Sequence, residues 1–403
     1  MKRALSILLA LVMVFALCAC GSSAPAASQP AAEPAAEPAT EASTESVPAE
    51  EPAAEVPDTP FGIQPLEKMT TIDVAYFSGA EHGLVFYIMD EMGWAEELNM
   101  KFNYNYFNAG PALMEANASW DVGTAGAAGA VNGLVGYDIN VIAVSQYEHI
   151  LHGFVHPDSA IAKAGKGNVP EAPNVYGDAE SLKGTTWLIP KGTTAQQTLG
   201  LYLAYFGLTT DDVTMTHMDV GSALAAFRAG EGDGIINWTA TDMAAQADGY
   251  TVCVSCDDVS GVYSCELVAS EHALNEKFDA IVTLTELYLR TEDWMMENRE
   301  EMAKFYYDAC EVEGITCTEE SAAYTAEAYE GLGYERGTAR MVELVDDPQG
   351  LAGRQITGAE FDVLDTMDFQ VSVGSYTPEQ RAAVLESGKI NSSVVEAILA
   401  KNS

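Results

Sequence analysis

Segments with the hydrophobic pattern of strands and of helices alternate along this chain, and that alternation restricts the fold more than any other feature. Residues 71–77 and 100–106 are typical of strands and flank a helix-like segment at 83–98. Further strands are predicted at 120–124, 139–145, 185–189, 215–217 and 234–238, with helices from Gly110, Ala125, Thr194 and Val220 and at 281–289, 295–310 and 394–399. This order predicts an α/β fold with parallel sheets that are covered on both faces.

The first twenty residues have the form of a secretory signal that ends in a lipidation site. Lys2 and Arg3 precede an apolar stretch at 4–17, which is too short for a stable membrane span. Small residues then lead to Cys20, as in bacterial lipoproteins. We therefore expect residues 1–19 to be removed and a lipid on Cys20 to anchor the chain to the extracytoplasmic face of the cell membrane. Ordinary secretion is the alternative.

A tether is expected to follow the lipidated cysteine and to complete the segment 20–68. Residues 24–60 consist mainly of Ala, Pro, Glu, Ser and Thr, with few large apolar side chains to bury. Prolines favour extended conformers and glutamates repel one another, so such a segment stays disordered and extended. The composition therefore predicts a spacer between the membrane and a folded body.

The charge of the chain excludes one class of partner. Its 60 acidic and 19 basic residues give a formal net charge of −41 at pH 7, and residues 24–60 contribute only eight of the acids. Nucleic acids are excluded as partners, because binding to phosphates needs basic patches. An acidic body also gives an anionic solute no long-range attraction, which counts against an anionic ligand.

Five cysteines lie beyond Cys20, so one of them must stay unpaired within the chain. Cys310 and Cys317 are close enough in sequence for a local disulfide, which an extracytoplasmic location permits. Cys253 and Cys256 have the spacing of a redox or zinc motif but occur in a strand-like segment without a second pair. We expect a bridge from that pair to Cys265, or free buried thiols.

Several short motifs in the middle of the body resemble a known family. They are Ser181-Leu182-Lys183-Gly184, the segment 190–195, the segment 207–213, the segment 225–234 and Asn237-Trp238. In this order they resemble the extracytoplasmic binding proteins of ABC importers for nitrate, sulfonates and taurine, relatives of the pyrimidine-precursor binders. The resemblance covers about residue 72 to the C-terminus.

The resemblance implies a two-lobed periplasmic-binding-protein fold of type II. Lobe 1 would comprise 69–150 and 264–403, lobe 2 would comprise 151–263, and two hinge segments near 146–153 and 261–265 would join two parallel-sheet lobes. It also implies a small-molecule ligand, a partner in the permease of an ABC transporter and a monomeric protein. No cofactor, metal or catalytic residue is expected, and the chain has no G-x-S-x-G, H-E-x-x-H or P-loop motif.

Loops that lead from a strand into a helix supply the candidate binding residues. Backbone N–H groups and the positive end of a helix dipole make such loops receptors for carboxylate or sulfonate, although ordinary capping by Ser and Thr explains each loop alone. The candidates are Ser78, Gly79, Ala80, Glu81 and His82 in the first loop, Gly110 and Pro111 in the second, Thr124, Ala125 and Gly126 in the third, and Gly192, Thr193 and Thr194 in the fourth.

An aromatic and a titratable group extend this list. Trp238, beside Thr239 and Asp242 at a strand-to-helix turn, is expected to line the cleft, with a place in the core as the alternative. Glu81 and His82 would suit a ligand that carries an amine or a heterocycle.

Three histidines, His149, His152 and His156, suggest a rival function. A metal-dependent hydrolase would use them to hold an ion, but residues 149 and 152 of one strand point to opposite faces. We therefore expect structural histidines near the hinge. A surface lipoprotein that reports a ligand to a receptor without transport is a third hypothesis.

Overall fold

A computed structural model describes residues 58–77, 81–259, 261, 263–347 and 349–402. The predicted signal, Cys20 and most of the predicted tether lie outside the described residues, as do Ser78, Gly79 and Ala80. Within the described part of the chain, no helix is both long and apolar enough to cross a membrane.

Lobe 1 is built on a six-stranded sheet with the strand order β11-β4-β10-β3-β1-β2. Its strands are β1 (Thr70–Phe77), β2 (Met100–Phe107), β3 (Val122–Gly126), β4 (Ile139–Tyr147), β10 (Ser264–Ser270) and β11 (Glu330–Gly331). The inner strand β4 is buried along almost its whole length because both of its faces are covered, whereas β2 at the edge alternates between more buried and more exposed side chains.

Lobe 2 is built on a five-stranded sheet with the strand order β7-β6-β8-β5-β9. Its strands are β5 (Leu151–Val155), β6 (Thr186–Ile189), β7 (Thr214–His217), β8 (Gly234–Trp238) and β9 (Thr251–Ser255). A short antiparallel pair, β12 (Leu344–Val345) and β13 (Ile356–Thr357), lies outside both sheets. The two-sheet α/β architecture expected from the alternation is confirmed.

The expectation of parallel sheets is correct for only part of each sheet. Strand β1 is parallel to β2 and β3, and β6 is parallel to β7 and β8. Strand β10 is antiparallel to β3 and β4, and β5 is antiparallel to β8 and β9. The reversals of β5 and β10 both follow a crossing between the lobes, and the two-residue strand β11 is also antiparallel to β4. A chain that enters a sheet at the carboxyl ends of the parallel strands has to run against them.

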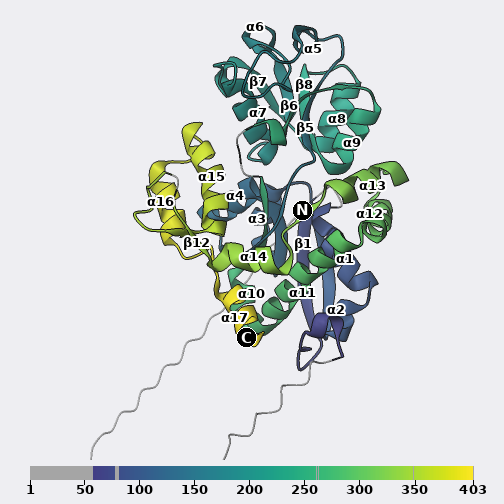
Figure 1. Cartoon of the computed structure of the whole chain (residues 1–403), viewed down its shortest axis with the longest axis vertical. Coiled ribbons are helices and arrows are strands. Elements are labelled where there is room, and N and C mark those ends of the chain that lie inside the picture. Colours follow the sequence, from purple (N-terminus) through teal and green to yellow (C-terminus); the bar gives the residue numbers. More distant parts are fainter. Residues whose placement is uncertain (1–57, 78–80, 260, 262, 348, 403) are drawn as a thin grey trace, which may run out of the picture. The chain divides into compact units, whose positions relative to one another are not determined.

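Helices cover the sheets of both lobes (Figure 1). In lobe 2 they are α5 (Ala160–Ala164), α6 (Ala179–Leu182), α7 (Thr194–Ala204), α8 (Val220–Arg228) and α9 (Thr239–Ala247). In lobe 1 they are α1 (Glu81–Glu91), α2 (Trp94–Glu97), α3 (Gly110–Glu115), α4 (Ala127–Gly136), α10 (Glu271–Glu276), α11 (Phe278–Glu297), α12 (Arg299–Glu313), α13 (Glu319–Ala328), α14 (Gly333–Val342), α15 (Gly358–Ser372), α16 (Pro378–Glu386) and α17 (Ser393–Lys401). Short 3-10 turns occur at Pro60–Gly62, Asn117–Ser119, Thr210–Asp212 and Cys256–Asp258.

One predicted helix is divided. The segment 83–98 forms α1 and α2, which are separated at Gly93, where φ is +72°. Glycine adopts this left-handed conformation without steric cost, so the chain can turn there. The period of apolar residues continues across the break because both helices pack against lobe 1, which explains why the pattern suggested one helix.

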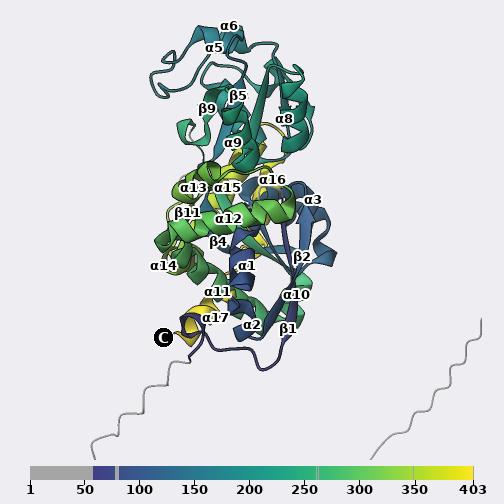
Figure 2. The same cartoon turned by 90° about the vertical axis from the view of Figure 1, so that its right-hand side faces the viewer.

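Helices of the C-terminal region also contact lobe 2. The ring of Phe369 in α15 lies where a Cβ on Gly200 of α7 would be, and Thr366 donates a hydrogen bond to Gln197 at 3.2 Å. Helix α13 lies beside α9 of lobe 2 (Figure 2). The lobes therefore meet along these helices as well as at the crossing segments.

The five described cysteines are free thiols, and the predicted disulfide between Cys310 and Cys317 is not formed. The two thiols instead share a hydrogen bond, which lowers the pKa of Cys317 to about 6. Cys253, Cys256 and Cys265 are buried, which matches the expectation of free buried thiols. Burial raises the pKa of Cys253 to about 12, so this thiol stays protonated and unreactive.

Close contact between α3 and α4 depends on glycine and yields the first prediction. A Cβ on Gly129 would lie 3.2 Å from the Cα of Gly110 and 3.3 Å from the Cβ of Ala125. We expect Gly129→Val to lower the free energy of unfolding by about 1–3 kcal/mol, because the helices would have to move apart. Urea unfolding measures this change. The control is Gly136→Ala in the same helix, where a Cβ meets nothing within 4 Å. Equal effects of the two substitutions would contradict the packing argument.

Candidate ligand-binding site

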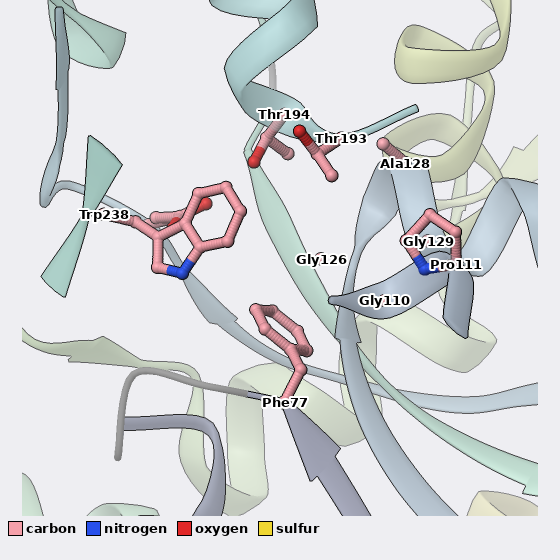
Figure 3. A pocket seen from close by; sticks show the side chains of 10 residues that line it. Phe77, Gly110, Pro111, Gly126, Ala128, Gly129, Thr193, Thr194 and Trp238 are labelled. Carbon is pink, nitrogen blue, oxygen red and sulfur yellow. The ribbon is translucent and has the colours of Figure 1, made fainter. Parts of the chain in front are cut away.

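A small cavity lies between the two lobes, where strands end and helices begin. Its lining consists of Phe77, Gly110, Pro111, Gly126, Ala128, Gly129, Glu148, Thr193, Thr194 and Trp238. Figure 3 shows the Phe77 and Trp238 rings, both threonines and Pro111 around the same space. The cavity has a volume of about 20 Å³, which is room for about one water molecule. A larger hollow of about 520 Å³ is lined by residues of lobe 1 alone, and one of about 640 Å³ by residues of lobe 1 and of the segment before it. A hollow of about 470 Å³ is lined by both lobes and shares Glu148 with the small cavity.

Small residues form the lobe 1 side of the cavity. Gly126 ends β3, and a Cβ there would lie 3.6 Å from the Thr194 methyl of lobe 2. Pro111 stands in the first turn of α3, where its fixed φ suits a helix and its missing N–H costs nothing. These residues allow lobe 2 to approach the backbone of lobe 1 closely.

The start of α7 forms the lobe 2 side. Thr193 occupies the N-cap position, but its hydroxyl donates to the Pro190 carbonyl oxygen at 3.1 Å and makes no capping hydrogen bond. The backbone N–H of Gly192 donates to the Gln196 side chain at 3.0 Å. Ordinary capping by Thr193 therefore does not explain why a threonine stands here.

Aromatic rings close one wall of the cavity. Phe77 at the end of β1 and Trp238 at the end of β8 meet edge to face, with centroids 6.0 Å apart. Thr239, which follows Trp238, has a φ of +40°. This conformation is strained for a β-branched residue, and such strain is typical of functional sites.

Glu148 is the acidic residue of the cavity lining and lies on the first crossing segment. Its side chain is almost fully buried, and burial together with the charges of Glu81 and Asp242 raises its pKa to about 8. A hydrogen bond from Thr194, at the start of α7, partly offsets this rise. The carboxyl group of Glu148 therefore faces the N-terminal end of a lobe 2 helix.

Glu81 and His82 begin α1 behind the Phe77 ring. Burial raises the pKa of Glu81 to about 7, although Gln146 donates a hydrogen bond to it at 3.1 Å. Burial lowers the pKa of His82 to about 3, so this ring is neutral at physiological pH, and it stacks on Phe77 at 3.9 Å. Among the described residues, His82 Nδ1 has no hydrogen-bond partner.

The three histidines near the hinge have separate partners. His149 bonds Asp257 at 2.9 Å and Glu330 at 2.8 Å, His152 bonds Asp242 at 2.7 Å, and the His156 ring stacks on Phe227 at 4.2 Å. Within the part of the chain that the structure describes, no group of three His, Cys, Asp or Glu side chains is placed to hold a metal ion.

The predicted site residues divide into two groups. The cavity lining includes Gly110, Pro111, Gly126, Thr193, Thr194 and Trp238. The other described candidates lie next to it. Thr124 donates a hydrogen bond to the His82 carbonyl oxygen at 2.9 Å, Ala125 packs in the core, and an ideal Cβ on Gly192 would lie 3.8 Å from Pro111. The N–H of Thr239 donates to the Ile150 carbonyl oxygen, and Asp242 bonds His152.

Sequence reasoning missed Phe77, Ala128, Gly129 and Glu148. Phe77 is the last residue of a predicted strand. Because the other candidates were found at the ends of predicted strands, the same signal could have identified it. Glu148 lies within the predicted hinge segment, where an acid carries no local motif. Its burial depends on the approach of α7 from the other lobe.

Comparisons with known proteins agree with the motifs. Residues 174–302 match the NMT1/THI5-like family model, which confirms the resemblance. A protein of Brachyspira hyodysenteriae, described as a candidate ABC transporter periplasmic binding protein, is 31% identical over 201 residues. This match covers 49% of the chain and 58% of the relative, so the chain spans somewhat more than half of that protein's length.

Solved structures share the fold at low sequence identity. The nitrate-binding protein NrtA of Synechocystis has a TM-score of 0.61 and 11% identity, with 83% of this chain and 89% of that chain covered. The aliphatic sulphonate-binding protein SsuA of Escherichia coli has a TM-score of 0.57 and 18% identity, with 78% and 91% covered. The two-lobed periplasmic-binding-protein fold is thereby confirmed.

The raised pKa of Glu148 gives a prediction for stability. The folded protein holds this proton up to about pH 8, whereas the unfolded chain loses it near pH 4.5, so the free energy of unfolding falls as pH rises between these values. At pH 9 we expect Glu148→Gln to be more stable than the native protein by a few kcal/mol, because each unit of pKa shift corresponds to about 1.4 kcal/mol. At pH 5 the two proteins should differ little in stability. Urea unfolding at both pH values tests this. The exposed Glu311→Gln serves as the control, and an equal response of both variants would contradict the assignment.

His149 gives a prediction of opposite sign. Its hydrogen bond to Asp257 raises its pKa to about 9, with burial opposing and Glu330 adding to the rise. The stabilisation is complete below the unfolded value of about 6.5 and is lost as pH rises through 9. We expect the thermal midpoint of His149→Gln to lie below that of the native protein at pH 6 and to approach it at pH 10. His217→Gln, on exposed strand β7, should show no such convergence. A constant difference for His149→Gln would refute the ion pairs.

Proposed function

We propose that this chain is an extracytoplasmic solute-binding protein that captures a small molecule between its lobes and delivers it to the permease of an ABC importer. The observation that carries this proposal is the cavity lined by strand ends and helix starts of both lobes. Ligands of open α/β sheets bind at such edges, where backbone N–H groups and helix dipoles converge.

The relatives support the same function. The family match and the Brachyspira relative point to binding proteins of ABC transporters, and proteins of the same fold bind nitrate and aliphatic sulphonates. For this chain we infer the same role in transport. We do not infer an anionic ligand, because the lining of its cavity differs in charge from that of an anion site.

Capture requires the lobes to separate. A cavity of about 20 Å³ admits no organic solute, so the solute enters an open form and the lobes close around it. The crossing segments, between β4 and β5 and between β9 and β10, are the places where the backbone can bend. A solute stabilises the closed form only if it binds that form more tightly than the open one.

The remaining features of the proposal concern the location of the protein. We infer that Cys20 carries a lipid, that the segment up to residue 68 tethers the body to the extracytoplasmic face of the membrane, and that the protein works as a monomer. Lobe 1 at 69–150 and 264–403 and lobe 2 at 151–263 remain the proposed domains. Such an anchor would keep the captured solute near the importer.

Binding rather than catalysis is the function that the hinge histidines favour. His149 and His152 are each held by carboxylates, and the described residues show no shared metal site between them. A hydrolase that used these rings would first have to break their ion pairs. Their positions on the crossing segment and on β5 instead suit a structural role at the hinge.

A thermal-shift screen tests the proposed function. We expect at least one solute among sulfonates, nitrate, bicarbonate, aromatic acids, pyrimidines and amines to stabilise the purified full-length chain. At a hundredfold excess over Kd the gain is about 2.7 kcal/mol. Thr194→Trp should abolish the shift by filling the cavity, whereas Thr216→Trp on the exposed face of β7 should retain it. A screen without any hit, or a shift that survives Thr194→Trp, would contradict the proposal.

A further inference from the structure

We propose that the solute of this cavity is a small organic cation, which places its positively charged nitrogen against Glu148 and between the Phe77 and Trp238 rings. The inference rests on the function proposed above and names the class of solute that this site takes. Anions such as nitrate or a sulfonate would be excluded.

The first argument is that the anion position at α7 is already filled by the protein. The start of this helix carries the positive end of its dipole, where a carboxylate or sulfonate is stabilised. In this chain Glu148 and Thr194 line the cavity together, so a carboxyl group of the protein itself lies beside this helix start. Once Glu148 ionises, the crossing segment therefore supplies its own anion to the helix, and a second anion beside it would be repelled.

The second argument is the balance of charge around the cavity. Glu148 is the one ionisable residue among the described residues that line it, and none of these is Lys or Arg. Glu81 and Asp242 lie close enough to raise the pKa of Glu148, and His149 acts in the opposite direction. His149 is committed to Asp257 and Glu330. The net charge of −41 extends this preference to long range, because it attracts cations and repels anions.

The third argument is the aromatic wall. Phe77 and Trp238 are both nearly buried and meet edge to face across the lobe boundary. A cation over the face of a tryptophan is attracted by the ring electrons, most strongly when both partners are desolvated. The ring pair and the carboxylate together bind a positive nitrogen and the apolar carbons attached to it.

The buried acids also explain why a cation would drive closure. Carboxyl groups that are buried together resist ionisation, which is why Glu148 and Glu81 keep their protons to higher pH than usual. A bound cation offsets the cost of ionising these buried acids. It does so only in the closed form, where the lobes enclose the cation together with Glu148. The titratable groups that face Glu148 include Glu81, Asp242, His149, Cys256, Tyr263 and Cys265. Tyr147, Asp257, Arg340 and Asp362 line a second hollow together with Glu148.

A matched set of probes tests the class of solute. Benzylammonium, benzyl alcohol and benzenesulfonate share a ring and differ in charge, and tetramethylammonium adds a cation that cannot titrate. We expect isothermal titration with the full-length chain to detect the two cations and to find benzenesulfonate at least about tenfold weaker than benzylammonium. The affinity for tetramethylammonium should rise about tenfold or more from pH 6 to pH 8, with release of protons, because Glu148 must ionise.

Variants of Glu148 separate charge from shape. Glu148→Gln should weaken benzylammonium by about 10- to 100-fold, which is the range for a hydrogen bond to a charged group. It should also weaken tetramethylammonium, which donates no hydrogen bond, through loss of the charge attraction. It should leave benzyl alcohol unchanged. Glu148→Asp keeps the carboxylate and should retain the preference for cations, and Glu311→Gln should bind as the native chain does.

The results distinguish this inference from the proposed function. Tighter binding of benzenesulfonate than of benzylammonium, no binding of either cation, or unchanged cation affinity in Glu148→Gln would overturn the cation assignment. If the cation assignment failed in this way but an anionic or neutral probe bound, that binding would still support a solute-binding protein. The absence of binding by any probe here and in the wider thermal-shift screen would count against the proposed function itself.

Discussion

The chain crosses between its two sheets at the edge where the parallel strands end, and most features of the site depend on this constraint. Because both crossings enter a sheet from that edge, β5 and β10 run against their neighbours. The residues between β4 and β5 then lie beneath the cavity, where Glu148 faces Thr194 of the opposite lobe. The proposed hinge and the floor of the proposed binding site are therefore the same piece of backbone. Any group that binds Glu148 acts directly on the segment that has to bend.

This arrangement costs stability. Burial opposes the ionisation of both Glu148 and Glu81, and Thr239 holds a strained backbone conformation beside the aromatic wall. Replacement of such acids by apolar or amide side chains would relieve the penalty, so their presence is difficult to explain as a packing solution. Local conflicts of this kind occur where binding, rather than folding, determines the residue.

The sequence predicted the elements better than it predicted their directions and contacts. Period and end signals placed the strand at 234–238 and the helices from Thr194 and Val220 where the structure has them. The reversal of β5 and β10 and the break at Gly93 follow from tertiary connections and backbone conformation that hydrophobic periodicity does not encode. The predicted bridge between Cys310 and Cys317 is a hydrogen bond between thiols, because proximity in sequence does not fix the bonding of the sulfur atoms.

The same limit explains why the loops suggested an anion site and the structure favours a cation. A helix start contributes about 0.3–1 kcal/mol to a nearby charge, and about 2 kcal/mol in favourable partly buried geometry. Two unit charges 4 Å apart interact by about 4 kcal/mol at an effective dielectric constant of 20. Once Glu148 is ionised, its carboxylate beside the start of α7 therefore outweighs the helix dipole and reverses the preference of the site. Since Glu148 reaches that position from a crossing segment 46 residues before Thr194, the sign of the site is set by tertiary structure and can change while the fold stays the same.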